Sequence, residues 1–222
     1  MELKVIAHIH TDFPEKFGVP RQSGLVGVTG KIIFEPEYCV ADAFKGLEGY
    51  SHLWLIWQFS EIEENKWSPT VRPPRLGGNK RMGVFATRSP YRPNSIGLSS
   101  VELVKIEHDE ALGTVITVKG ADMVNGTPIF DIKPYLAYTD SHPNAIGGFA
   151  DDVIENKLKA KIPENLLKKI PKQHLKDITE ILENDPRPSY HDDASRVYGM
   201  SYAGMEIKFT VKEGIVEICD IN

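Results

Sequence analysis

The chain has only two cysteines among 222 residues, Cys39 and Cys219, and they lie far apart in the sequence. A disulfide framework is therefore not indicated. Long hydrophobic runs are missing too, since the longest, Leu53–Trp57, is far too short to cross a bilayer. The first twenty residues lack the basic start and apolar stretch of a signal peptide. These absences argue against disulfide-rich secreted and membrane-spanning classes, and we expect a cytoplasmic protein.

Signatures of the common nucleotide-binding and hydrolytic folds are absent as well. The sequence has no G-x-G-x-x-G after a strand, no P-loop and no G-x-S-x-G turn. His8 and His10 are close in sequence, but no cysteine or third ligand accompanies them. We interpret both as ordinary strand residues and expect no metal site.

One stretch lacks acidic residues altogether. No Asp or Glu occurs between Asn65 and Val101, although the whole chain has a net charge of −5. Seven basic residues fall in this interval: Lys66, Arg72, Arg75, Lys80, Arg81, Arg88 and Arg92. The interval therefore has a local positive field that the net charge conceals, and such a field suits phosphate or carboxylate groups.

Strand-like patterns dominate the first two-thirds of the chain. Short apolar runs bounded by Gly, Pro or polar residues lie at residues 3–10, 27–36, 53–60, 82–88, 99–109, 113–123 and 129–137. A short helix is expected over 40–52, with Asp42 as its cap, and residues 68–80 are expected to form a long loop. Strands at this spacing favour a β-barrel or a β-sandwich.

The composition changes near residue 150, where a segment rich in Lys and Glu begins. A helix is predicted over about 171–183 from the helical spacing of Leu175, Ile178, Ile181 and Leu182. Residues 205–211 and 214–220 are typical of a closing hairpin. We therefore predict a mainly β protein, with a β-rich domain over 1–150 and a smaller α+β domain over 151–222.

Two basic stretches in the β-rich region carry residue types suited to ligand binding. The stretch KFGVPRQSGL, residues 16–25, is either a plain turn between strands or a rigid loop that presents Arg21 and Gln22 to a ligand. The stretch RMGVFATRSPYRPNSIGLSS, residues 81–100, is either a solvated basic loop or a segment that its prolines stiffen. In the second case Arg88 is placed to pair with a carboxylate or phosphate.

A third stretch, DMVNGTPIFDIKPYLAY, begins at residue 122 and contains a strong Asn-Gly turn signal. Thr127 and the amides of this turn are candidates to cradle a polar group. Asp131 and Lys133 lie two residues apart, on one face of the expected strand. A plain hairpin with a surface ion pair between these two side chains explains the same residues.

The fourth stretch, ENDPRPSYHD, follows the predicted helix at residues 183–192. It is either an extended linker or a stiff loop that clusters Asp185, Arg187 and Tyr190. In the second interpretation the carboxylate polarises a proton, the guanidinium holds a phosphate and the phenol ring stacks on a base.

Five stretches together add a family resemblance. They are KFGVPRQSGL, GLEGYSHLWLIWQF, TVRPPRLGGNKRMGVFATRSPYRPNSIGLSSVEL, GADMVNGTPIFDIKPYLAY and NDPRPSY, in this order. In combination they closely resemble the TrmO/TsaA family, also called YaeB-like, over nearly the whole chain from about Val5. The resemblance implies a small antiparallel N-terminal β-barrel and an S-adenosylmethionine-dependent tRNA methyltransferase. The expected target is the exocyclic amine nitrogen of threonylcarbamoyl-adenosine, next to the anticodon of threonine tRNA.

The resemblance also implies a homodimer, with the cofactor near the subunit interface and a C-terminal domain that takes part in tRNA recognition. The residues expected to contact S-adenosylmethionine are Pro20, Arg21, Gln22, Ser60, Glu61, Arg88, Leu98, Asn125, Gly126, Thr127 and Pro128. Asp185, Arg187 and Tyr190 are the expected catalytic residues, with Asp185 as the candidate general base. The remaining basic residues between Arg72 and Arg92 are expected to follow tRNA phosphates.

The sequence departs from the family pattern at two positions. Asn125 stands where the family usually has Asp, and Ser95 stands where it usually has a second Pro. The first change removes a negative charge that would offset the cofactor's sulfonium. Two alternatives stay open: a methyltransferase of the same fold that acts on another RNA or a small molecule, and, because of the lost charge, a non-catalytic cofactor-binding or tRNA-binding protein. The retained DPRPSY stretch favours tRNA.

Overall fold

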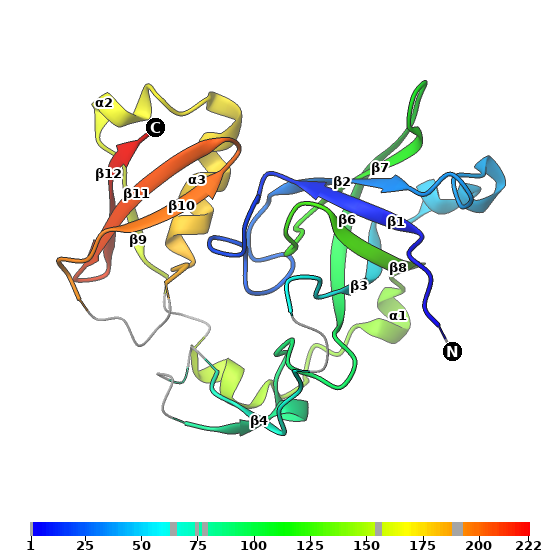
Figure 1. The fold of residues 1–222 in the computed structure, drawn as a ribbon, viewed down its shortest axis with the longest axis horizontal. Coiled ribbons are helices and arrows are strands. Elements are labelled where there is room, and N and C mark those ends of the chain that lie inside the picture. The colour runs from blue at the N-terminus through cyan, green and yellow to red at the C-terminus, as the bar shows by residue number, and fades with distance from the viewer. Residues whose placement is uncertain (1, 63–65, 74–75, 77–79, 154–156, 188–192) are drawn as a thin grey trace.

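The computed structural model of the chain describes residues 2–62, 66–73, 76, 80–153, 157–187 and 193–222. Figure 1 shows a β-barrel and a separate curved sheet side by side, with the small sheet that contains β4 (Thr70–Val71) below them. A search of the described residues finds no helix that combines the length and the apolar character needed to cross a membrane.

Six antiparallel strands form the closed barrel. In barrel order they are β1 (Ala7–Thr11), β2 (Thr29–Phe34), β7 (Gly113–Lys119), β6 (Ile96–Asp109), β3 (His52–Gln58) and β8 (Thr127–Pro134). Pairing of β1 with β8 closes the circle, with Ile9 opposite Thr127. The mainly β fold and the antiparallel N-terminal barrel are therefore confirmed.

Side chains that alternate along the strands fill the barrel. On β3 the inward side chains of Leu53, Leu55 and Trp57 are buried, while the intervening residues are only partly covered. The indole ring of Trp57 lies across Gly97, its partner on β6, where an added Cβ would come within 2.2 Å of the ring. Glycine at this position therefore lets a large aromatic ring pack flat against the neighbouring strand.

The second sheet has four strands in the order β10 (Tyr198–Tyr202), β11 (Met205–Lys212), β12 (Ile215–Ile221) and β9 (Lys159–Lys161). Its helices are α2 (Glu164–Leu167) and α3 (Lys172–Glu183), and α1 (Ala137–Asp140) follows the last barrel strand. Strand β9 runs parallel to β12, and the other pairs are antiparallel. The predicted helix over 171–183, the closing hairpin and the α+β character of this region are confirmed.

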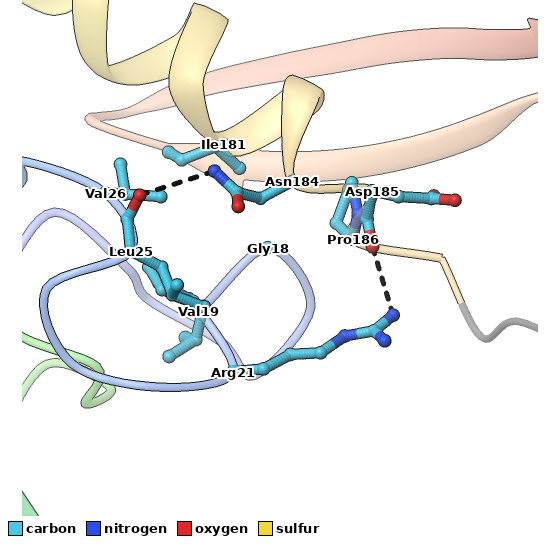
Figure 2. A pocket seen from close by; sticks show the side chains of 10 residues that line it. Gly18, Val19, Arg21, Leu25, Val26, Ile181, Asn184, Asp185 and Pro186 are labelled. Atoms are coloured by element: carbon cyan, nitrogen blue, oxygen red, sulfur yellow. Dashed lines mark hydrogen bonds between the residues drawn. The ribbon is translucent and has the colours of Figure 1, made fainter. Parts of the chain in front are cut away.

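The loop between β1 and β2 joins the two parts of the molecule. Its side chains Phe13, Val26 and Val28 are buried in the core of the C-terminal sheet rather than in the barrel. The Asn184 side chain at the end of α3 donates to the Leu25 carbonyl oxygen at 3.4 Å (Figure 2). The C-terminal core is therefore completed by residues near the other end of the chain.

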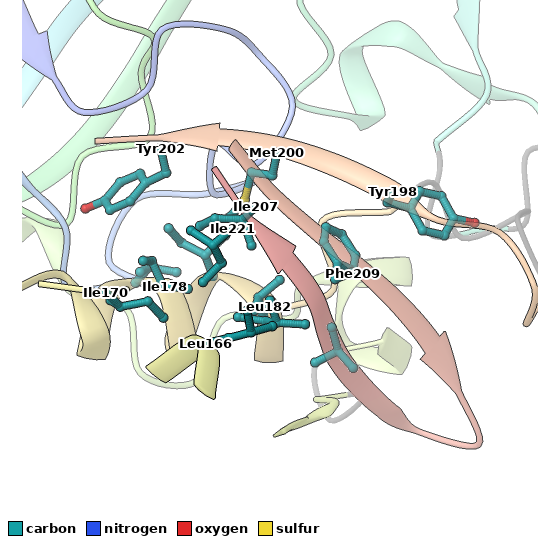
Figure 3. Packing of buried hydrophobic residues seen from close by; sticks show 14 of the residues in the cluster. Leu166, Ile170, Ile178, Leu182, Tyr198, Met200, Tyr202, Ile207, Phe209 and Ile221 are labelled. Carbon is teal, nitrogen blue, oxygen red and sulfur yellow. The ribbon is translucent and has the colours of Figure 1, made fainter. Parts of the chain in front are cut away.

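The rest of that core lies between α3 and the sheet. Figure 3 shows Ile178 and Leu182 of α3 pointing toward Ile207 and Ile221, with the Phe209 ring further along the sheet. All five side chains are almost fully buried. The apolar face of α3 is thus covered by the sheet, which explains the helical spacing that the sequence shows.

Two sequence-based expectations are wrong. The helix expected over 40–52 is two short 3₁₀ turns, Ala41–Phe44 and Leu47–Gly49, because Gly46 between them has a φ of +87°. Asp42 lies inside the first turn, and the residue at its cap is Val40.

The strand expected over 82–88 is also mostly wrong. Only β5 (Met82–Gly83) is extended, paired with β4 (Thr70–Val71), and a 3₁₀ turn follows at Val84–Ala86. The Arg92 guanidinium donates to the carbonyl oxygens of Val84 and Thr87 at 3.1 and 2.8 Å. These bonds fold the segment back on itself, so its carbonyl groups accept hydrogen bonds from Arg92 instead of from a neighbouring strand.

A further 3₁₀ turn spans Gly148–Val153.

Candidate active site

Two of the basic stretches meet at the rim of the barrel. The exposed Arg88 guanidinium donates a short hydrogen bond to the Gln22 side-chain oxygen. The backbone N–H of Gly24, two residues further on, donates to the Gly120 carbonyl oxygen at 2.9 Å. The loop before β2, the arginine-rich segment and the loop after β7 therefore come together here, which sequence separation alone does not reveal.

A carboxyl group that sequence analysis did not select lies at the centre of this meeting point. Asp122 lies between the buried residues Ala121 and Met123 and accepts a hydrogen bond of 2.6 Å from the Ser99 hydroxyl. Burial raises the pKa of Asp122 to about 6, although the hydrogen bond from Ser99, the backbone N–H of Ser23 and the charge of Arg88 all lower it. The signal in the sequence was an acidic residue between the apolar residues Ala121 and Met123, near the end of the strand expected over 113–123.

The backbone N–H groups of the Asn-Gly turn are already hydrogen-bonded to other parts of the protein. The backbone N–H groups of Asn125 and Gly126 donate to the carbonyl oxygens of Phe13 and Ile9, each at 2.8 Å. The buried Thr127 hydroxyl donates to the Val124 carbonyl oxygen at 2.7 Å. Asn125 and Gly126 are exposed and Pro128 is half-buried. A ligand at this turn would thus meet side chains and carbonyl oxygens, not the amides that the sequence suggested as a cradle.

The remaining predicted cofactor residues lie around the same end of the barrel. The Leu98 side chain on β6 is 57% exposed, which is high for a leucine in a strand. Ser60 and Glu61 are exposed just after β3, and the preceding Phe59 N–H donates to the Ser95 carbonyl oxygen at 2.9 Å. The end of β3 is therefore tied to the arginine-rich segment.

Arg21 points in the other direction, toward the end of α3 (Figure 2). Its guanidinium donates to the Asp185 carbonyl oxygen at 3.0 Å and to the Arg187 carbonyl oxygen. Pro20 and Pro186 line the pocket between these two segments. The first and fourth stretches, far apart in the sequence, therefore form one continuous surface.

Within the fourth stretch, Asp185 and Arg187 form a bidentate ion pair. The guanidinium donates to both carboxylate oxygens, at 2.8 and 2.9 Å, and this pairing raises the pKa of Arg187. The Arg187 guanidinium also lies 5.8 Å from the centre of the Tyr198 ring. Tyr190, the third residue predicted for this cluster, lies outside the described residues.

Several basic side chains between residues 65 and 101 are exposed, and we call them the basic edge. The side chains of Arg72, Lys80, Arg81 and Arg88 are exposed, whereas Arg92 is used inside its own segment. Arg75 lies outside the described residues. Four of the positive charges that the sequence concentrates between 65 and 101 therefore face solvent, and one of them, Arg88, lies at the barrel rim.

Residues that the sequence singled out form ion pairs on the outer barrel surface. Asp131 pairs with Lys133 at 2.8 Å, which confirms the surface pair that the sequence allowed, and His8 lies 3.1 Å from Glu35. Among the residues that the structure describes, no group of three or more His, Cys, Asp or Glu side chains has an arrangement that suits a metal ion.

Comparison with known protein families assigns the chain. The model of the tRNA-methyltransferase O N-terminal domain matches residues 8–141, and that of the TrmO C-terminal domain matches residues 154–222. The chain belongs to the TrmO family. The resemblance on which the sequence analysis relied is therefore confirmed.

Individual relatives of the TrmO family agree over the full length. A tRNA (adenine(37)-N6)-methyltransferase of Escherichia coli strain K12 is 39% identical over 98% of this chain and 96% of the relative. A Pseudomonas aeruginosa protein, named as an S-adenosylmethionine-dependent methyltransferase, is 34% identical over 97% of this chain and 95% of its own. A crystal structure of TrmO from Pseudomonas aeruginosa superposes with a TM-score of 0.82 at 28% identity, covering all of this chain and 96% of that one.

Proposed function

We propose that this chain is a tRNA (adenine37-N6)-methyltransferase that uses S-adenosylmethionine and acts on adenosine 37 bearing a threonylcarbamoyl group in threonine tRNA. The observation that carries the proposal is the match of both TrmO domains, together with 39% identity to the Escherichia coli enzyme over 98% of the chain. A tRNA substrate is consistent with the exposed basic edge, and we place the reaction in the cytoplasm.

The residues at the barrel rim have the chemistry that the cofactor needs. The exposed Arg88 guanidinium suits its carboxylate, and the exposed Leu98 side chain offers an apolar surface to its adenine. The carbonyl oxygens of the Asn125–Gly126 turn suit the adenine amine, because the turn amides are already paired. When bound, S-adenosylmethionine supplies an activated methyl group. We therefore propose that Gln22, Arg88, Leu98 and Asn125 form the cofactor site.

The chain's own contribution to rate lies mainly in placing the target nitrogen in line with that methyl group. The target nitrogen is a weak nucleophile, since its lone pair is conjugated with the purine and with a carbonyl group. As the new N–C bond forms, the nitrogen must lose its proton, and a base that accepts it contributes roughly 10²–10⁴-fold. Asp185 remains our candidate, but both its oxygens are held by Arg187. The pair must therefore separate before Asp185 accepts a proton, and the tRNA phosphates are a natural alternative partner for Arg187.

Asp185→Asn tests this role without disturbing the backbone. Asp185 has a φ of +48°, a conformation that Asn tolerates better than most residues. We expect kcat to fall at least 100-fold without any weakening of tRNA binding, measured by single-turnover methylation and filter binding. Arg187→Lys is the companion variant, because it keeps the positive charge but cannot form the bidentate pair with Asp185. Normal turnover by Asp185→Asn would eliminate the carboxylate as the base.

We also propose that the active unit is a homodimer. Several large apolar side chains of the arginine-rich segment are exposed, among them Phe85 (75%), Tyr91 (43%) and Leu98 (57%). Exposed apolar groups gathered on one segment are typical of a surface that a partner covers. Light scattering at micromolar concentration is expected to give twice the 24.9 kDa chain mass, and a monomeric mass would contradict this.

The deciding experiment for the function is methyl transfer from radiolabelled S-adenosylmethionine to two tRNA pools. One pool carries the threonylcarbamoyl modification and the other comes from cells that do not make it. Label only in the modified pool is expected. Label in both pools would indicate another target nucleotide, and label in neither, with cofactor bound, would indicate a small-molecule substrate or a binding role.

A further inference from the structure

Asp122 is a carboxyl group to which the mechanism above gives no role. It is connected to the barrel interior by two consecutive hydrogen bonds, from the Trp57 indole N–H to the Ser99 hydroxyl at 2.9 Å and from that hydroxyl to Asp122 at 2.6 Å. Ser99 is 1% exposed. A carboxyl group held this closely by a buried hydroxyl is fixed in position by the core of the barrel.

The same carboxyl group contacts or neighbours each segment of the proposed cofactor site. It lies close enough to the backbone N–H of Ser23, which directly follows Gln22, for that group to lower its pKa. It accepts the hydroxyl of Ser99, which directly follows Leu98. It also comes three residues before Asn125 in the chain. Three segments that each carry a proposed cofactor residue therefore meet at one side chain.

We propose that Asp122 is the positioning residue of the cofactor site, holding the Gln22–Ser23 loop against β6 and supplying the negative charge that balances Arg88 and the cofactor's sulfonium. This inference rests on the proposed function, because it concerns the same cofactor. It extends that function by naming the group that shapes the site.

The charges around Asp122 support the second half of the proposal. The positive charge of Arg88 lowers the pKa of Asp122, and the Arg88 guanidinium is hydrogen-bonded to the neutral Gln22 side chain. Asn125 is neutral, whereas the family usually has Asp there. S-adenosylmethionine carries a sulfonium and an ammonium against one carboxylate, so the cofactor and Arg88 together have two net positive charges, of which the predicted contact Glu61 offsets one. The Asp122 carboxylate removes that imbalance.

This arrangement makes cofactor affinity depend on pH. Burial keeps the pKa of Asp122 near 6, so the carboxylate becomes protonated in the mildly acidic range. A protonated Asp122 offers no negative charge to the cofactor. Affinity for S-adenosylmethionine is therefore expected to fall about three- to fourfold as the pH decreases from 7.5 to 5.5, because a group with this pKa stays about one quarter ionised at pH 5.5.

The test is calorimetric binding of S-adenosylmethionine, without tRNA, to the full chain and three variants across this pH range. Asp122→Asn is expected to bind at least tenfold more weakly at pH 7.5 and to lose most of the pH dependence. Ser99→Ala keeps the carboxylate but removes a bond that lowers its pKa, so the midpoint of the affinity change should move to higher pH. Asp131→Asn, a surface carboxylate on β8, is the control and should match the unchanged chain.

Each outcome has a definite meaning. Wild-type affinity and pH profile in both Asp122→Asn and Ser99→Ala would overturn the inference while leaving the proposed function intact. If Asp122→Asn fails to fold, the midpoint shift in Ser99→Ala decides alone, because a purely structural role of Ser99 would lower affinity without moving a pH midpoint. Failure of the unchanged chain to bind S-adenosylmethionine would contradict the proposed function itself, and the inference with it.

Discussion

At the scale of single residues, the candidate site is built from polar groups that hold one another. Arg21 binds carbonyl oxygens of the fourth stretch, Arg88 binds Gln22, and Asp185 is paired with Arg187. Asp122 differs from these, since a half-buried carboxyl group with a raised pKa lowers the stability of the folded chain at neutral pH. Titratable groups with perturbed pKa values that lower stability in this way are common at functional sites.

The stability of an Asp122→Asn variant relative to the unchanged chain is expected to depend on pH. Between pH 4 and 6 the folded chain retains the proton on Asp122 while the unfolded chain has lost it, so the unfolding free energy of the unchanged chain falls as pH rises. A pKa raised from 3.8 to about 6 corresponds to about 3 kcal/mol. Urea unfolding at pH 4 and pH 7.5 should show the variant gaining roughly that much relative to the unchanged chain. An equal difference at both pH values would contradict the raised pKa.

At the scale of elements, the loop between β1 and β2 matters most. It places Gln22 at the barrel rim, directs Arg21 toward the end of α3, and buries Phe13 in the C-terminal core. The Gly27 N–H donates to the Glu180 carboxylate of α3 at 2.8 Å, and Gly18 lies against Met200 of β10, where an added Cβ would come within 2.6 Å of the sulfur. A single loop thus links the cofactor site to the helix that precedes the predicted catalytic stretch.

Phe13→Ala is expected to lower the unfolding free energy by about 3–5 kcal/mol, because it leaves a cavity among fully buried side chains. The Phe13 ring contacts Tyr202 with a centroid distance of 5.0 Å, so the loss should appear first in the C-terminal sheet. Hydrogen exchange on β10 and β11 measures this directly. Tyr138→Ala, at a side chain that is 87% exposed, should change stability by no more than about 0.5 kcal/mol.

At the scale of the whole molecule, the barrel and the C-terminal sheet are not independent units. The C-terminal core needs Phe13, Val26 and Val28 from the loop before β2. A fragment of residues 151–222 is therefore expected to lack a cooperative thermal transition in circular dichroism. Addition of a peptide covering residues 12–28 should partly restore it. A cooperative transition in the fragment alone would show that the loop contributes little.

The basic edge is expected to act on tRNA through its phosphates. Arg81→Gln and Lys80→Gln should each weaken tRNA binding and reduce the slope of log Kd against log salt concentration by about one. Lys105→Gln, where the lysine pairs with Glu107 on a barrel strand, should leave the slope unchanged. If tRNA binding by the unchanged chain does not depend on salt concentration, the basic edge does not bind tRNA phosphates.

The sequence by itself determined the elements and the family, because strand alternation, the helical spacing before Asn184 and the turn residues are local signals. It was wrong over 40–52 and 82–88, where a left-handed glycine and the Arg92 side chain override the apolar pattern. Only the tertiary structure decided that Ser99 meets Asp122, 23 residues away, and that Arg21 reaches Asp185, 164 residues away. Closure of the barrel and insertion of one loop into a second core create these contacts, and no local pattern encodes them.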